Sequence, residues 1–194
     1  MKKDIILAGV GGQGILSIAA SIGLAAVEAG MFLKQAEVHG MSQRGGDVQS
    51  NLRLSDKEIA SDLIPFGQAD MILSVEPMES LRYLPWLSKE GWLITNATAF
   101  QNIPNYPNKD ELMAEIKKQP KHIIIDADFI AKELGSARSA NMVVLGAATP
   151  FLEIEYKYLE FAIRKLFGSK GEKVVQLNLD ALIAGEEFAR NYMK

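Results

Sequence analysis

The sequence of 194 residues contains no cysteine and only two histidines, His39 and His122. Without cysteine the chain cannot form a disulfide, hold an iron–sulfur cluster through thiolates or build a cysteine-ligated zinc site. The two histidines have no metal-ligand spacing, so we expect no metal site. Any cluster or nucleophilic thiol that a reaction requires must come from a partner.

The sequence also lacks a block of like charges. Its 21 lysines and arginines nearly balance 24 aspartates and glutamates, for a net charge of −3. A general nucleic-acid binder would carry a basic patch, so we expect no nucleic-acid partner. With 48% hydrophobic residues the chain has enough apolar side chains for a core. Its length predicts a single domain over residues 1–194.

A membrane segment is the next feature to test. Ile5–Val27 is an uncharged run of 23 residues, and a bilayer span needs about 20 apolar residues. A signal peptide is the other interpretation. Glycines and Gln13 interrupt the run where a helix should be continuous, and Asp4 lies where a signal peptide is positive. We therefore expect a strand, a turn and a buried helix in a cytoplasmic protein, with no membrane contact.

Hydrophobic periodicity predicts strands that alternate with helices. The expected strands are Asp4–Ala8, Phe32–Val38, Asp47–Ser55, Met71–Val75, Gly91–Asn96 and His122–Asp126. The expected helices are Ile15–Ala29, Pro77–Leu84, Leu112–Lys118, Phe129–Leu134, Asn141–Ala148 and Glu153–Phe167, whereas Glu172–Tyr192 begins either as a strand or as a helix. The pattern predicts an α/β three-layer sandwich with a Rossmann-like, mostly parallel sheet. The alternating segment Asp47–Ser55 is expected to be a half-buried antiparallel strand.

A glycine-rich loop, Gly9-Val10-Gly11-Gly12-Gln13-Gly14, joins the first expected strand to the first helix. Its glycines have the spacing of a dinucleotide-binding loop. They let the backbone turn sharply near a phosphate, and the helix N-terminus offers unpaired N–H groups. A tight strand-to-helix turn without a ligand is the alternative. A nicotinamide site would also need an acid about 20 residues further on. Glu37 has that distance but lies in a poor buried strand, so the fingerprint is incomplete.

A second loop, Ser42-Gln43-Arg44-Gly45-Gly46, places an arginine beside paired glycines. The guanidinium is a permanently charged planar fork that suits phosphate or carboxylate. Backbone N–H groups of the glycines can line up beside it. A hairpin-like turn with a solvated arginine is the alternative.

The two loops together resemble a known family. Gly9–Ile15, then Arg44–Gly46, then a strand ending Leu52–Ser55, resemble the gamma-type subunit or domain of 2-oxoacid:ferredoxin oxidoreductases. Ala69–Leu73 resembles a strand of that family, and Asn141–Ala147 resembles its late asparagine-to-glycine helix motif. The resemblance covers nearly the whole chain in the right order. It implies a gamma-type domain over residues 1–194.

Within the family, Glu37–Gly46 most resembles the indolepyruvate, or aryl-pyruvate, branch, because Met41-Ser42-Gln43 departs from the run that precedes Arg-Gly-Gly in pyruvate-type enzymes. In this family a 2-oxoacid is decarboxylated on thiamine diphosphate, electrons pass through iron–sulfur clusters to ferredoxin, and coenzyme A takes the acyl group. The resemblance implies that a larger alpha subunit carries the thiamine diphosphate and the clusters, in a heterodimer or heterotetramer. This chain would complete the assembly and bind the nucleotide end of coenzyme A.

The resemblance and the loop chemistry together assign a set of binding residues and no catalytic residue. Arg44 is expected to be an anion clamp or an interface residue, and Ser42 a further donor. Asn141 and Gly146 are expected either at the same cleft or in packing. The residues assigned to cofactor binding are Gly9, Gly11, Gly12, Gln13, Gly14, Ser42, Arg44, Gly45, Gly46 and Asn141.

Four acids near strand ends, Glu76, Glu79, Asp126 and Asp128, are expected to be helix caps or solvated side chains. His39 is expected to satisfy a local hydrogen bond or to face the partner. Three other functions stay open. They are a pyruvate- or 2-ketoisovalerate-type gamma subunit, a free-standing NAD(P)- or flavin-binding oxidoreductase, and a scaffold whose cleft binds nothing.

Overall fold

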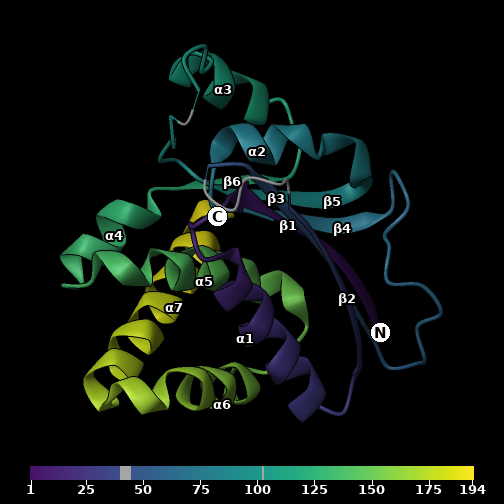
Figure 1. Ribbon diagram of the computed structural model, residues 1–194, viewed down its shortest axis with the longest axis vertical. Helices are drawn as coiled ribbons and strands as arrows, with labels where there is room; N and C mark the ends of the chain where they lie inside the picture. The colour runs from purple at the N-terminus through teal and green to yellow at the C-terminus, as the bar shows by residue number, and fades with distance from the viewer. Residues whose placement is uncertain (40–44, 102) are drawn as a thin grey trace.

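A six-stranded sheet organises the computed structural model, which describes residues 1–39, 45–101 and 103–194 (Figure 1). The strand order is β2-β3-β1-β4-β5-β6. β3 is antiparallel to both β1 and β2, whereas β1, β4, β5 and β6 pair in parallel, so the expected mostly parallel sheet with an antiparallel strand is confirmed. The strands are β1 Lys2–Val10, β2 Phe32–His39, β3 Asp47–Ser55, β4 Ala69–Ser74, β5 Leu87–Asn96 and β6 His122–Ile125.

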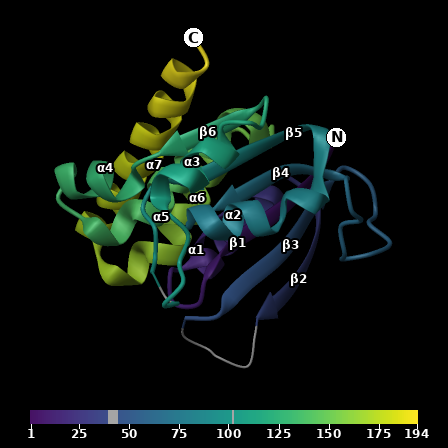
Figure 2. The same ribbon diagram turned by 90° about the horizontal axis from the view of Figure 1, so that it is seen from above.

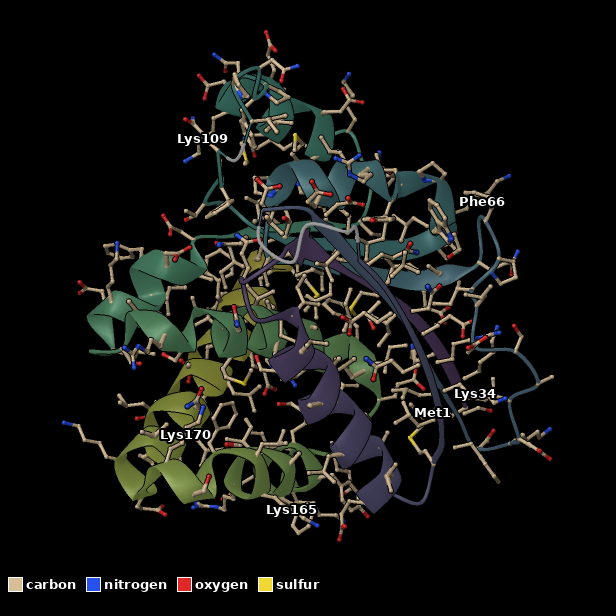
Figure 3. The ribbon with its side chains drawn as sticks, viewed as in Figure 1. Met1, Lys34, Phe66, Lys109, Lys165 and Lys170 are labelled. Atoms are coloured by element: carbon tan, nitrogen blue, oxygen red, sulfur yellow. The ribbon has the colours of Figure 1, made fainter. Side chains whose placement is uncertain are left out.

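Helices cover both faces of the sheet and complete the three layers. Figure 1 shows α2 and α3 above the sheet and α1, α5, α6 and α7 below it. In Figure 3, Lys109 and Lys165 mark these two outer layers, on α3 and α6 respectively. The helices are α1 Ile15–Glu28, α2 Pro77–Arg82, α3 Lys109–Ile116, α4 Ala127–Glu133, α5 Ala140–Leu152, α6 Tyr156–Phe167 and α7 Glu172–Tyr192. Three short 3-10 helices are η1 Leu84–Trp86, η2 Ala137–Ser139 and η3 Gly168–Lys170.

The central strand β1 supplies both hydrophobic cores because successive side chains point to opposite faces. Ile5 and Leu7 pack with α1, α5, α6 and α7, in the larger core. Ile6 and Ala8 pack toward α2 and α3, in a smaller core with Ile116. A strand buried on both faces reads as the continuous apolar run seen at Ile5–Ala8.

The C-terminal segment corrects one of the alternatives left open by the sequence. Glu172–Tyr192 is one continuous helix, so a strand start at Val174–Leu179 is wrong. Val175, Leu179 and Leu182 are buried at helical spacing. α7 also crosses α5 closely, because a Cβ at Gly146 would collide with the Leu182 carbonyl and one at Gly185 with the Val143 carbonyl. Gly146 is therefore a packing residue.

Strand β3 is more deeply buried than its alternating sequence predicted. Its apolar Leu52 and Leu54 face the larger core as expected. The polar side of the strand is covered as well, since Asn51 is buried and its Oδ1 accepts the Ile64 N–H at 3.1 Å. The sequence predicted a half-buried strand because alternation shows only one apolar face. It does not show that the segment around Ile64, outside the strand, covers the polar face. Figure 2 shows β2 and β3 toward one edge of the sheet, away from α4 and α7.

Among the described residues, every helix falls short of the combined length and apolar character needed to cross a bilayer. The uncharged run Ile5–Val27 is divided between β1, the glycine loop and α1. The expected strand, turn and buried helix are confirmed.

Candidate functional site

The glycine loop connects β1 to α1 through a backbone that only glycine adopts easily. Gly12 has φ +100° and Gly14 has φ +80°, both in the left-handed region that is costly for residues with a Cβ. Gln13 closes the turn, because its N–H donates to the Val10 carbonyl at 3.0 Å and its Oε1 accepts the Val10 N–H at 2.8 Å. The side-chain oxygen of Gln13 therefore holds the loop.

Close contacts fix this loop on both sides. A Cβ at Gly9 would lie 2.5 Å from Val75 Cγ2, and one at Gly14 would collide with Asn141 Nδ2. Asn141 Nδ2 donates to the Gly14 carbonyl at 3.2 Å, across 127 residues of sequence. The N-terminal turn of α5 is therefore joined to the N-terminus of α1. Neither helix has a side-chain cap at its N-terminus, so the orphan N–H groups expected there have no such partner.

The second loop meets the first through its glycines. Gly11 N–H donates to the Gly46 carbonyl at 2.8 Å, and Gly45 N–H donates to the Gly11 carbonyl at 3.4 Å. Gly9 and Gly11 thus serve the loop architecture, and the Gly11 N–H is already used. Ser42 and Arg44 lie outside the described residues, as does the side chain of His39, so their assigned roles stay predictions.

A cavity of about 380 Å³ opens beside the glycine loop. It lies at the carboxyl ends of β4 and β5, because Val75 and Asn96 form part of its wall. Ligands of open α/β sheets bind at this edge. The volume falls within the range of about 300–1,000 Å³ found for small-molecule sites. Its other lining residues include Gly12–Gly14, Thr98–Phe100, Asp128, Arg138 and Asn141.

Two side chains of opposite charge, Asp128 and Arg138, line this cavity. Asp128 Oδ2 accepts a hydrogen bond from Asn96 Nδ2 at 2.8 Å. Asn96 is itself fixed, because its Oδ1 accepts the Ala127 N–H at 3.1 Å. Arg138 is exposed on η2 and forms no ion pair with the described residues. A planar cation beside two uncapped helix N-termini suits an anionic ligand.

Sequence reasoning missed Arg138 and Phe100. Neither lies in a recognised motif, and both reach the cavity through connections that follow other strands. A weak sign was present in Arg138, which lies three residues before the predicted binding residue Asn141. One helical turn separates positions three apart, so an arginine there is close to that asparagine.

Two of the four acids near strand ends are helix caps, as expected, whereas the expectation of a cap or a solvated side chain is wrong for Glu79. Glu76 accepts the Glu79 N–H at 2.8 Å and begins α2, and Asp126 accepts the Phe129 N–H at 3.0 Å and begins α4. Glu79 is buried, and its Oε2 accepts from Arg82 Nε at 2.6 Å. Burial raises the pKa of Glu79, although Arg82 opposes the shift. Asp128 differs, since it lines the cavity.

The structure places the acid expected for nicotinamide binding, Glu37, away from the glycine loop. Glu37 is exposed on β2, and β3 lies between β2 and the glycine-loop strand β1. A dinucleotide fold needs the acid on the strand beside the loop. The insertion of β3 moves Glu37 one strand too far away.

Comparisons with known proteins also favour the 2-oxoacid oxidoreductase family over a nicotinamide-binding protein. Residues 4–188 match the family model described as pyruvate ferredoxin/flavodoxin oxidoreductase. The chain is 37% identical to "Indolepyruvate oxidoreductase subunit IorB" of Archaeoglobus fulgidus, over 95% of this chain and 94% of that protein. It is 29% identical to "Pyruvate/ketoisovalerate oxidoreductases common subunit gamma" of Pyrococcus furiosus, over 93% and 95%.

A solved structure shares the fold. It is the 2-oxoglutarate:ferredoxin oxidoreductase of Magnetococcus marinus with 2-oxoglutarate, coenzyme A and succinyl-CoA bound, at a TM-score of 0.76 and 23% identity. The match covers 98% of this chain and 31% of that chain, so the fold forms one part of a longer polypeptide there. With a family model that spans residues 4–188, this chain belongs to the pyruvate ferredoxin/flavodoxin oxidoreductase family.

Proposed function

We propose that this chain is the small subunit of an indolepyruvate ferredoxin oxidoreductase and acts as one gamma-type domain over residues 1–194. The complex decarboxylates aryl 2-oxoacids oxidatively to acyl-CoA and reduces ferredoxin. Support for the aryl branch comes from the 37% identity to the Archaeoglobus fulgidus subunit against 29% to the pyruvate/ketoisovalerate subunit. The departure at Met41-Ser42-Gln43 points the same way.

The amino-acid composition agrees with a division of labour between two subunits. Iron–sulfur clusters are held by cysteine thiolates, and this chain has no cysteine. As the family resemblance implies, a larger alpha subunit carries the clusters, together with the thiamine diphosphate that supplies the decarboxylation chemistry. The two subunits assemble as a heterodimer or heterotetramer, and ferredoxin is reduced by the complex. This chain contributes a binding cleft and no acid–base group.

The cleft of this chain binds the nucleotide end of coenzyme A. The observation that carries this proposal is the 380 Å³ cavity, which brings the uncapped Gly12–Gly14 turn, the start of α5 and Arg138 to one place. Coenzyme A carries a diphosphate and a 3′-phosphate, and backbone N–H groups with a guanidinium complement these anions. Gly12, Gly14 and Arg138 contact phosphate, while Gln13 and Asn141 keep the loop in place.

A titration of coenzyme A against the reconstituted two-subunit complex tests this cleft. Gly12→Val should weaken binding at least tenfold, because φ +100° is strained for a β-branched residue and the added side chain enters the cleft. Gly30→Val is the matched control, at φ +77° in open space far along the chain at the end of α1. Unchanged affinity for Gly12→Val would remove the binding role and leave the scaffold function.

A second experiment distinguishes the enzyme classes. Steady-state activity of the reconstituted complex should be higher with aryl than with aliphatic 2-oxoacids. The isolated chain should oxidise no 2-oxoacid and should reduce no dye with NADH. A preference for pyruvate or 2-ketoisovalerate would favour the gamma subunit of that branch, and dye reduction by the isolated chain would favour a free-standing oxidoreductase.

A further inference from the structure

Glu76 is an unusual residue at the start of a helix. The preferred N-cap residues are serine, threonine, aspartate and asparagine, whose short side chains reach the N–H groups of the first turn. Glu76 performs this task for α2 through Oε2, which accepts the Glu79 N–H at 2.8 Å. The side chain is fully buried and forms no ion pair within the described ranges. Capping alone therefore does not explain why a longer, charged residue occupies this buried position.

The other carboxylate oxygen explains it. Glu76 Oε1 accepts the Phe100 N–H at 3.2 Å and the hydroxyl hydrogen of Tyr106. Both donors belong to the connection between β5 and α3, which lies 24 to 30 residues further along the chain. A shorter cap would reach α2 alone. A buried carboxylate is costly unless donors surround it, and the two donors from this connection hold Phe100 and Tyr106 against the start of α2.

The residue fixed in this way forms a wall of the cleft. Thr98, Ala99 and Phe100 line the same cavity as the Gly12–Gly14 turn. Phe100 retains 45% of its surface exposed, which is large for an aromatic residue whose backbone is bonded to a buried carboxylate. An exposed ring beside an anion-binding turn is a stacking surface for a flat base whose phosphates occupy the turn.

We propose that Glu76 is a positioning residue, which with Tyr106 holds Phe100 as the aromatic wall against which the purine base of the bound nucleotide lies. The proposal rests on the binding of the nucleotide end of coenzyme A in this cleft. It adds the residue that contacts the base and the device that places it. Glu76 acts through Phe100 and touches no ligand itself.

Calorimetric titration of the reconstituted complex with adenosine 3′,5′-bisphosphate tests the contact directly, since this probe carries the base and phosphates but no thiol. Phe100→Ala should raise its Kd about tenfold, the loss typical of one base–aromatic stack. Phe100→Trp should restore binding to within about twofold, because a larger ring stacks at least as well. An unchanged Kd in Phe100→Ala would overturn the proposal.

Tyr106→Phe tests the positioning step, because it removes one hydrogen bond to Glu76 and keeps the ring. We expect a Kd about threefold to fivefold higher for the bisphosphate, and a KM for coenzyme A that rises in proportion at unchanged kcat. The KM for pantetheine, which lacks the nucleotide, should not change. Glu76→Gln, which keeps length but loses an acceptor, should act in the same direction. Tyr192→Phe on α7 is the control.

The outcomes separate this proposal from the one on which it rests. Weakened binding in Gly12→Val with unchanged binding in Phe100→Ala would overturn only the aromatic wall. Unchanged binding in both would overturn coenzyme A binding itself. Equal increases in KM for coenzyme A and pantetheine in Tyr106→Phe would show a general disturbance of the fold and would overturn the positioning role. Melting temperatures accompany each variant, and should Glu76→Gln fail to fold, the two milder variants decide.

Discussion

The two ends of the parallel strands differ in how their charged side chains are paired. At the end where β1 begins, Asp4 is fully buried and accepts from Arg53 Nε at 2.8 Å and Nη2 at 3.0 Å. Arg53 Nη1 also donates to the Ser61 and Leu63 carbonyls, each at 3.0 Å. Asp70 Oδ2 accepts the Asp4 N–H at 2.8 Å. The charges of Asp4 and Arg53 are therefore paired within the chain.

Among the described residues, the carboxyl ends of the strands have an unpaired cation beside them. The helices α1 and α5 begin there without side-chain caps, and Arg138 forms no ion pair with the described residues. Under the proposed function, the first end stabilises the fold and the second binds the ligand. Variants at the first should therefore change the free energy of unfolding, and variants at the second should change affinity.

The largest effect is expected for Arg53→Met. This change leaves the buried Asp4 with the exposed Lys2 as its remaining ion-pair partner. Removing one partner of a buried pair costs about 3–5 kcal/mol of unfolding free energy. Urea denaturation at pH 7 measures the loss, and Arg190→Met, whose pair with Glu186 is largely solvated, should cost less than about 1 kcal/mol. Equal losses in the two variants would remove the distinction between the two ends.

Arg138→Gln should have the complementary effect. Its unfolding free energy should stay within about 0.5 kcal/mol of the unchanged chain, as for most surface substitutions. The Kd for coenzyme A should rise about tenfold to a hundredfold, because hydrogen bonds between charged groups contribute about 1.5–3 kcal/mol. Lys132→Gln, on the neighbouring helix α4, should leave the Kd unchanged. A Kd insensitive to Arg138 would show that the cleft binds its ligand without this cation.

A smaller, pH-dependent effect is expected for Glu79, which lies in α2. Burial raises its folded pKa above the ordinary value of 4.5, so the folded state binds its proton more tightly than the unfolded state. The contribution of Glu79 to stability is therefore greatest below pH 4.5 and declines as pH rises toward the folded pKa. The unfolding free energy of Glu79→Gln, measured from pH 4 to pH 7, should lack this decline. Parallel curves for the two proteins would contradict the burial effect.

The smallest effect is expected for Gln13→Ala. It removes the side-chain oxygen that accepts the Val10 N–H, a contact that contributes about 1 kcal/mol. The Kd for coenzyme A should rise about twofold to threefold as the turn loosens, and the melting temperature should fall by a few degrees. Gln176→Ala on α7 is a matched control, because the Gln176 amide donates to Asp180 in a solvent-exposed hydrogen bond. A tenfold rise in Kd would show instead that Gln13 touches the ligand.

Much of the fold could be predicted because local patterns and burial agreed. The apolar run at Ile5–Ala8 predicted a strand buried on both faces, and the alternation at Asp47–Ser55 predicted the antiparallel strand. The start of α7 could not be settled, since Val174–Leu179 satisfies both periods over so few residues. The structure settles it as a helix, in which Val175 and Leu179 are buried together with Leu182.

The site could be predicted in part for a similar reason. A glycine loop between a strand and a helix can be recognised from the sequence alone. Gly12, Gly14 and the rest of that loop were therefore predicted as part of the candidate site. Asn141 was found through family resemblance. Arg138 and Phe100 reach the same cleft only because β4, β5 and the helix α5 end or begin at one edge of the sheet. Neither residue lies in a recognised motif, and the spacing of Arg138 from Asn141 is only a weak sign.

The sequence by itself therefore determined the class of fold, the family and the absence of cysteine ligands, because these depend on composition and on contacts between near neighbours. The tertiary structure decided which backbone donors of the glycine loop are already used. Gly11, Gly12 and Gln13 are adjacent in the chain, yet one N–H bonds to Gly46 and another to Val10. Hydrogen-bond capacity is a property of the assembled surroundings, and only the folded chain brings those surroundings together.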